Sequence, residues 1–180
     1  ALATPALAET AIGLSGAKTL VMIDTATATA TGTVEVQGVT ALLGIDYRPA
    51  NGTLIGVTDA QTIVVIDPAT GTTTALATMN TMLPVADAPV IVDVNPAADR
   101  LRFMSGTTNH RVNMDTGEVT VDGSLAFVAE DMHAGEAPDI VAAAYINSYG
   151  KPEKTAMFNI DATISAVIQD SAYAGFVSQL

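Results

Sequence analysis

Four short stretches of the chain resemble one another, and this repetition restricts the fold more than any other feature of the sequence. Each stretch combines β-branched or other apolar residues with an aspartate, and the four aspartates are Asp24, Asp67, Asp115 and Asp161. Consecutive aspartates are 43, 48 and 46 residues apart. A period of about 45 residues with β-type patterning is typical of β-propeller blades, which contain four strands each. Because the aspartates recur in every repeat, we assign them a structural role in turns.

The second repeat shows the predicted unit most clearly. Its strands are expected at residues 43–48, 53–58, 61–66 and 72–77. Asn51-Gly52 joins the first two strands, because this dipeptide readily adopts the positive φ angles of a hairpin turn. Asp67-Pro68-Ala69-Thr70-Gly71 joins the last two, since proline presets φ and glycine accepts the left-handed conformation. The last strand is the most polar, as expected for the solvent-facing strand of a blade.

The other repeats complete the fold prediction. In the third repeat, strands are expected at residues 90–94, 100–105, 110–114 and 118–121. The first repeat offers residues 11–14, 19–23 and 31–36, and the fourth offers 140–147, 154–160 and 163–169, so each terminal repeat is one strand short. We predict an all-β, β-propeller-like fold of about four blade repeats with incomplete terminal blades. Such a fold closes by pairing strands from the two chain ends, or it accepts a strand from another chain.

A run of alternating threonine and alanine covers residues 25–31. This composition suits an exposed loop or an edge strand. Strict alternation of small and β-branched residues specifies strand register weakly and can template pairing between molecules. We therefore expect either a protein partner or self-association through edge strands.

A chain of 180 residues is expected to form one domain. We assign it to residues 11–180, with repeats at about 11–38, 39–88, 89–137 and 138–180. Residues 1–10 are interpreted as a flexible terminus or a signal-peptide remnant, because Ala6-Leu7-Ala8 has the small-x-small form of a cleavage site. We therefore expect an exported protein, whether periplasmic, cell-surface or extracellular. No run of about 18 apolar residues is present, so we expect no membrane-spanning helix.

The composition argues against several function classes. A net charge of −12 disfavours nucleic-acid binding, which requires clustered lysine and arginine. The chain has no cysteine, which excludes disulfides, thiolate metal sites and a cysteine nucleophile. No glycine-rich phosphate loop and no Gly-x-Ser-x-Gly nucleophile motif occur. We therefore expect no enzymatic activity and no cofactor.

Several segments, taken in order, resemble the DUF4394 family of bacterial domains of unknown function. They are residues 43–54 (LGIDYRPANGTL), 66–71 (IDPATG), 93–102 (DVNPAADRLR), 111–117 (RVNMDTG) and 141–147 (VAAAYIN). The resemblance extends over about residues 18–170. It implies a secreted or surface-exposed bacterial domain with a propeller-like fold. It implies no known reaction and supplies no catalytic residues.

Asp46 and Asp93 are the candidate metal ligands. They occupy equivalent positions, each three residues before a proline, Pro49 or Pro96. Equivalent positions converge around the axis of a propeller, so the two carboxylates could line a polar channel and bind a cation such as calcium. The alternative is that each carboxylate accepts hydrogen bonds from backbone amides at a strand end.

A second calcium candidate is the segment with Asp93, Asn95 and Asp99, which resembles part of a calcium loop. It lacks the central glycine and the closing glutamate of such a loop. An ordinary Asx turn is the favoured interpretation of this segment.

The two histidines, His110 and His133, show no His-x-x-x-His spacing typical of zinc ligands. Glu130, Asp131 and Glu136 lie close to His133 in sequence and could complete a site around it. We interpret this segment as a solvated loop between blades.

Arg100, Arg102 and Arg111 form the main basic cluster and are the candidate partner-binding residues. They could receive an acidic protein partner, or they pair with nearby Asp99 or Glu118.

From these patterns we predict a non-catalytic, exported, β-propeller-like binding or scaffold domain. The alternative is a structural subunit of an extracellular or cell-surface assembly, completed by strand pairing between molecules. A cation-dependent hydrolase or lyase built on Asp46 and Asp93 is the lesser alternative.

Overall fold

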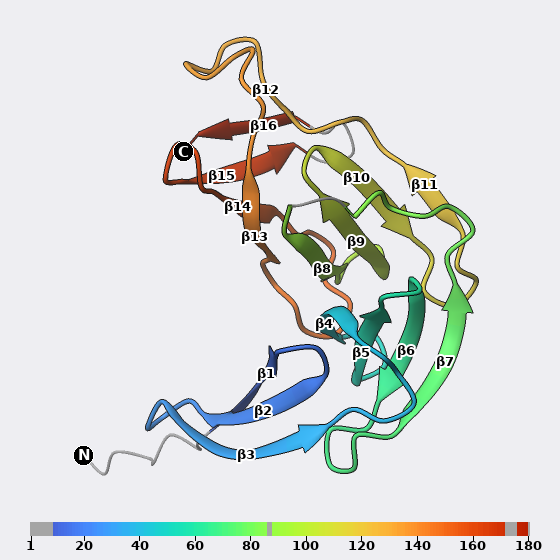
Figure 1. Ribbon diagram of the computed structural model, residues 1–180. Coiled ribbons are helices and arrows are strands. Elements are labelled where there is room, and N and C mark those ends of the chain that lie inside the picture. The colour runs from blue at the N-terminus through green and yellow to red at the C-terminus, as the bar shows by residue number, and fades with distance from the viewer. Residues whose placement is uncertain (1–8, 86–87, 172–175, 180) are drawn as a thin grey trace.

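The computed structural model describes residues 9–85, 88–171 and 176–179, and every regular element in this part of the chain is a β-strand. The strands form four sheets, which we number in chain order. Figure 1 shows the sheets following one another around an arc, with an open side between sheet 1 and sheet 4. Within the described residues no helix is present that could cross a membrane.

The first three sheets are antiparallel and are built from consecutive strands. Sheet 1 contains β1 (Thr10–Ser15), β2 (Thr19–Asp24) and β3 (Thr29–Glu35), the three strands expected for it. Sheet 2 contains β4 (Leu42–Arg48), β5 (Thr53–Thr58), β6 (Thr62–Ile66) and β7 (Thr73–Thr78). Sheet 3 contains β8 (Val90–Asn95), β9 (Arg100–Ser105), β10 (Thr108–Val112) and β11 (Val119–Val121).

Sheet 4 is more complete than the sequence predicted. It contains β13 (Ile140–Tyr145), β14 (Met157–Asp161), β15 (Ala166–Ser171) and β16 (Phe176–Gln179), which are antiparallel. The short strand β12 (Ala126–Phe127), from the range predicted for the third repeat, pairs with β16 in parallel. The prediction that the fourth repeat is one strand short is therefore wrong. β12 joins the sheet from a distant segment, and such a strand leaves no local repeat signal in the sequence.

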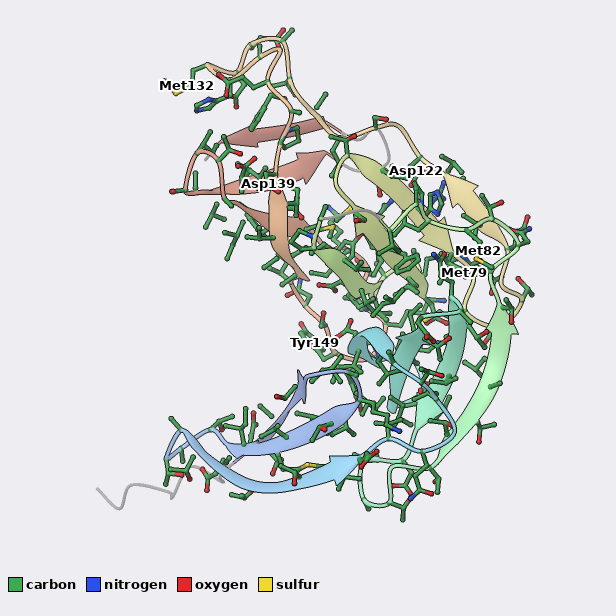
Figure 2. The ribbon with its side chains drawn as sticks, viewed as in Figure 1. Met79, Met82, Asp122, Met132, Asp139 and Tyr149 are labelled. Atoms are coloured by element: carbon green, nitrogen blue, oxygen red, sulfur yellow. The ribbon has the colours of Figure 1, made fainter. Side chains whose placement is uncertain are left out.

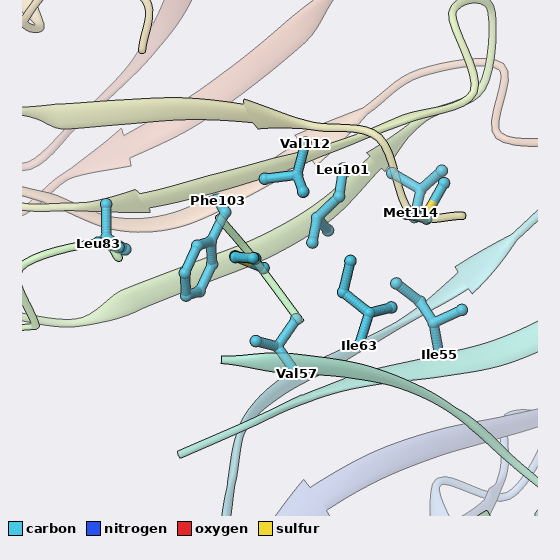
Figure 3. Close-up of a cluster of buried hydrophobic side chains, with 10 residues drawn as sticks. Ile55, Val57, Ile63, Leu83, Leu101, Phe103, Val112 and Met114 are labelled. Carbon is cyan, nitrogen blue, oxygen red and sulfur yellow. The ribbon is translucent and has the colours of Figure 1, made fainter. Parts of the chain in front are cut away.

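Sheets 2 and 3 have a neighbouring sheet on both faces, which explains their almost continuous apolar strands. In sheet 2, Ile55, Val57 and Ile63 pack toward sheet 3, whereas the alternating residues Leu54 and Val64 pack toward sheet 1. Each interface between successive sheets holds one cluster of buried apolar side chains. Figure 3 shows the cluster between sheets 2 and 3, in which Phe103 and Leu101 of β9 meet Ile55, Val57 and Ile63.

The first strands of sheets 2, 3 and 4 lie side by side along the inner side of the arc. β4 contacts β8, and β8 contacts β13. The later strands of each sheet lie farther out, as the sequence of β4 to β7 in Figure 1 shows. The contacts among these inner strands bring together polar residues that are far apart in the sequence.

The repeat aspartates of sheets 1 and 2 form the turns predicted for them. Asp24 Oδ1 accepts a hydrogen bond from Ala26 N at 2.8 Å, and Asp67 Oδ1 accepts one from Ala69 N at 2.8 Å. Asp24 ends, and Asp67 directly follows, the strand before the outermost strand of its sheet. The repeat therefore marks the same turn in sheets 1 and 2.

The predicted turn role holds for Asp161 at a different hairpin, and Asp115 lies in a turn that Asn113 closes. In sheet 3 the turn residue is Asn113, whose Oδ1 accepts a hydrogen bond from Asp115 N at 3.1 Å. Asp161 also closes a turn, with Thr163 N donating to its Oδ1 at 2.8 Å, but it follows the second strand of its sheet rather than the third. The spacing misled because asparagine and aspartate form the same turn, and because such turns occur at more than one hairpin of a sheet.

Candidate functional site

Asp46 and Asp93, the predicted metal ligands, lie on the inner strands β4 and β8. Asp46 Oδ2 accepts a hydrogen bond from the backbone nitrogen of Val94, in the next sheet, at 2.6 Å. Asp93 accepts the corresponding backbone hydrogen bond from Tyr145 of sheet 4. Each carboxyl group therefore joins one inner strand to the next.

Burial changes the acidity of both groups. It raises the pKa of Asp46, and the hydrogen bond from Val94 opposes this change. For Asp93, burial and the nearby negative charge of Asp46 raise the pKa to about 8, against the hydrogen bond from Tyr145. Asp93 therefore holds its proton at neutral pH, and a cation bound between the two groups would have to displace that proton.

The stability of the protein is expected to depend on pH through Asp93. An unfolded aspartate ionises near pH 4, whereas folded Asp93 ionises at about pH 8. Unfolding therefore releases a proton between these values, and the free energy of unfolding falls as the pH rises, on the order of 1 kcal/mol per pH unit. Asp93→Asn should flatten this slope in urea unfolding measured from pH 4 to pH 8. A slope that persists unchanged in the variant would contradict the assignment.

The side chains around Asp93 do not gather into a cation site. Nowhere in the described ranges do three or more histidine, aspartate or glutamate side chains come together as metal ligands. Asn95 Oδ1 accepts hydrogen bonds from Ala97 N at 3.0 Å and Ala98 N at 2.9 Å, which is an Asx turn. Asp99 binds an arginine of the neighbouring sheet. Asp93, Asn95 and Asp99 thus have separate partners.

Arg48, at the end of β4, connects sheet 2 to two turns of sheet 3. Its guanidinium group donates to Asp99 Oδ1 at 2.8 Å and Oδ2 at 2.6 Å, and to Asp115 Oδ1 at 2.7 Å and Oδ2 at 2.9 Å. The Arg48 side chain is only 7% exposed, whereas Asp99 and Asp115 are 23% and 62% exposed. We refer to Arg48, Asp99 and Asp115 as the Arg48 clamp.

The Arg48 clamp was not predicted from the sequence, although the repeats contain one sign of it. Gly52 and Asp99 occupy the same place in the first hairpin of sheets 2 and 3, and both have positive φ angles, 73° and 51°. Aspartate adopts this conformation at a cost that glycine avoids. A glycine replaced by aspartate in the next repeat indicates that the carboxylate has a role, which here is to bind Arg48.

A second polar cluster lies between sheets 3 and 4. Arg102 is buried and donates from Nη1 to Asn109 Oδ1 and Asp122 Oδ2, both at 2.7 Å. Arg111 donates to Asp122 Oδ1 at 3.0 Å. Burial raises the pKa of Asp122, but the hydrogen bonds from Arg111 and Arg102 outweigh it and hold the pKa below its usual value. Figure 2 marks Asp122 beside β10 and β11. Arg102 also reaches the Tyr145 hydroxyl at 3.4 Å, so this cluster too connects neighbouring sheets.

The structure places the three candidate partner-binding arginines on one face of sheet 3. Arg102 and Arg111 are directly paired across β9 and β10. Arg100 and Arg111 line a hollow of about 200 Å³ together with Asn113, Glu118 and Thr120. Arg100 donates to the backbone oxygen of Asp99 at 2.9 Å. Arg100 and Arg111 are therefore the two of the three that reach the surface hollow.

The two histidines lie in different surroundings. His110 is 2% exposed, and burial lowers its pKa. His133 Nδ1 lies 3.2 Å from Glu136 Oε2, and its ring centroid lies 5.4 Å from that of Phe127. These contacts lie within the 129–138 loop and between that loop and β12.

The chain is similar to one family model and to several solved structures. The model of DUF4394, a domain of unknown function, matches residues 19–179. No curated protein matches the chain significantly. The crystal structure of BamB from Moraxella catarrhalis is similar with 17% sequence identity and a TM-score of 0.42. That match covers 96% of this chain and 50% of the BamB chain, so the chain spans half of its length. Because the family model covers residues 19–179, nearly the whole chain, the protein belongs to the DUF4394 family.

Proposed function

We propose that this protein is an exported, β-propeller-like domain that binds or scaffolds another protein and catalyses no reaction. The arrangement of β4, β8 and β13 side by side at the inner side of four successive sheets supports the propeller-like description. The Ala6-Leu7-Ala8 segment supports export.

The observation that carries the proposal is that the buried arginine side chains make contacts between neighbouring sheets. Arg48 binds Asp99 and Asp115 across sheets 2 and 3, and Arg102 binds Asp122 while reaching Tyr145 of sheet 4. Both arginine side chains therefore stabilise the packing of neighbouring sheets. A rigid framework of this kind suits presentation of a surface to a partner.

The outward face of sheet 4 is the surface we assign to the partner. Ile160 and Val167 are directly paired across β14 and β15, and they are 48% and 50% exposed. Val141 of β13 is 38% exposed. Adjacent exposed apolar side chains on neighbouring strands are characteristic of protein interaction sites.

Cross-linking with mass spectrometry in native cells tests this assignment. Wild-type protein should give cross-links from the segments around β14 and β15 to another protein. The double variant Ile160→Thr, Val167→Thr keeps β-branched residues and should lose at least about nine-tenths of these cross-links. Val121→Thr, at a residue 60% exposed on β11, is the matched control and should retain them. Equal cross-linking by both variants would count against this surface.

Calorimetric titration separates the binding domain from the cation-dependent hydrolase or lyase. One calcium, magnesium or zinc ion bound per chain, with binding abolished by Asp46→Asn, would favour the enzyme and count against the proposal.

A further inference from the structure

In the described residues, sheet 1 has no counterpart of the innermost strand that the other sheets possess. The segments that follow β3 and β7 make the same contact with the next sheet, since Gln37 N donates to Gly71 O at 2.8 Å and Asn80 N donates to Gly117 O at 3.0 Å. β3 therefore corresponds to β7, the outermost strand of sheet 2. Counting inward, β2 corresponds to β6 and β1 corresponds to β5. The place that β4, β8 and β13 fill in their sheets has no strand in the described part of sheet 1.

The exposure of Tyr47 marks the same missing strand. Tyr47 lies opposite Leu54 on β5, just as Val94 lies opposite Leu101 and Tyr145 lies opposite Met157. Each of these inner-strand residues faces the preceding sheet. Val94 and Tyr145 are 1% and 8% exposed, whereas Tyr47 is 52% exposed. Tyr47 is therefore a large side chain that the inner strand of sheet 1 would cover.

One edge of β1 pairs with no strand in the described part of the chain, and it presents backbone groups to this place. Thr25 N donates to Glu9 O at 3.0 Å, and the register continues through Ala11 opposite Ile23. In an antiparallel pair the hydrogen-bonded positions alternate, so Ile12 and Leu14 direct their N–H and C=O groups away from β2. In the described residues β1 pairs with β2 only. Ile12 and Leu14 can therefore bond to a further strand.

We propose that the β1 edge accepts an extended segment of another protein chain, which adds antiparallel to β1 as the innermost strand of sheet 1. The site continues the line of inner strands β4, β8 and β13, and these strands define the chemistry of the occupant. β4 and β8 are apolar strands that each contain one aspartate bonded to the backbone of the next inner strand. The segment is therefore apolar with an aspartate that faces β4 beside Tyr47. This inference rests on the proposed binding function and names a second surface for it, distinct from sheet 4.

A peptide with the sequence of residues 89–96 (PVIVDVNP), labelled for fluorescence anisotropy, is the probe. It should bind the wild-type protein saturably. Ile12→Pro removes one outward N–H of β1 and should weaken binding at least about tenfold. Ile12→Ala is the matched control, because it also loses the side chain but keeps the N–H, and it should bind within about threefold of wild type. Both variants should melt within a few degrees of each other.

Nitration of tyrosine gives a second readout that needs no variant. The peptide should protect Tyr47, and it should leave Tyr149, which is 70% exposed, reactive as an internal control. Figure 2 shows Tyr149 in the loop between β13 and β14. The peptide contains no tyrosine, so the reaction reports the protein alone.

Several results would overturn the proposal. They are no binding up to about 1 mM peptide, equal binding by Ile12→Pro and Ile12→Ala, or full nitration of Tyr47 in the saturated complex. Light scattering that finds a dimer of the protein alone, dissociated by Ile12→Pro, would assign the edge to a second copy and would also overturn it. If the peptide does not bind at the β1 edge but the sheet 4 cross-links persist, this inference fails while the proposed function stands. The two failures are therefore distinguishable.

Discussion

Replacing Arg48 by methionine is expected to destabilise the protein by about 3 kcal/mol. Methionine keeps an unbranched apolar chain at this 7% exposed position but removes the charge between Asp99 and Asp115. The two carboxylates then lose four hydrogen bonds and repel each other. The exposure of Asp115, at 62%, keeps the effect below the upper end observed for fully buried pairs.

Urea unfolding measures this loss, and the surface pair of Lys18 and Glu35 supplies the control. Their Nζ–Oε1 distance is 3.0 Å, and the two side chains are 33% and 70% exposed. Lys18→Met should therefore cost less than about 0.5 kcal/mol. Arg48→Lys should be more stable than Arg48→Met but less stable than wild type, because one ammonium group cannot form bidentate hydrogen bonds with both carboxylates. A loss at Arg48 no larger than that at Lys18 would contradict the clamp.

A second substitution tests the positive φ of Asp99 within the Arg48 clamp. Asp99→Gly, introduced into the Arg48→Met variant, should raise its free energy of unfolding by about 1 kcal/mol. Glycine accepts the φ of 51° at this position, and the unpaired carboxylate is removed at the same time. Asp99→Gly in the wild-type protein should instead destabilise it, because the ion pair is worth more than the strain. The opposite order of effects would show that Asp99 is there for the turn alone.

Gly71→Ala is expected to cost about 3 kcal/mol or more and to loosen sheet 1 from sheet 2. Gly71 has a φ of 75°, and an added Cβ would collide with the backbone oxygen of Glu35 at the end of β3. Backbone cannot swing aside as a flexible side chain can. The hydrogen bond from Gln37 N to Gly71 O, at 2.8 Å, fixes the two segments at this contact.

Gly16→Ala separates the steric contact from the backbone conformation. Gly16 also has a positive φ, 61°, but an added Cβ would have no atom within 4 Å. Its variant should therefore lose only about 1 kcal/mol, the cost of the left-handed conformation. Hydrogen exchange should further show that Gly71→Ala exposes the Gln37 amide, whereas Gly16→Ala leaves it protected. Equal losses at the two glycines would rule out a decisive contact with Glu35.

The turn pattern illustrates how far local sequence information extends. Asp24 and Asp67 form their predicted turns because an Asx turn needs only the residues that follow within a few positions. Asp161 has the same local chemistry but lies in another hairpin of its sheet. Local chemistry identifies a turn, and it does not determine which strand of the sheet the turn follows.

Asp46 and Asp93 likewise show which features are local to the sequence and which depend on the tertiary structure. Their equivalence was readable from the shared spacing to Pro49 and Pro96, and both do lie on inner strands. Their partners, the backbone nitrogen atoms of Val94 and Tyr145, come from the next sheet in each case. The raised pKa of Asp93 depends on that burial and on its distance from Asp46 in space, which no spacing in the sequence specifies.

The sequence by itself determined an all-β chain, because alternating β-branched residues and turn-forming dipeptides act within a single hairpin. It also determined the approximate repeat, since each sheet buries its faces against a neighbour and needs similar strands to do so. Only the tertiary structure decided that sheet 4 gains β12 and that Arg48 binds Asp99 and Asp115. The contacts of Arg48 join residues 51 and 67 positions apart, and such pairings depend on how whole sheets pack.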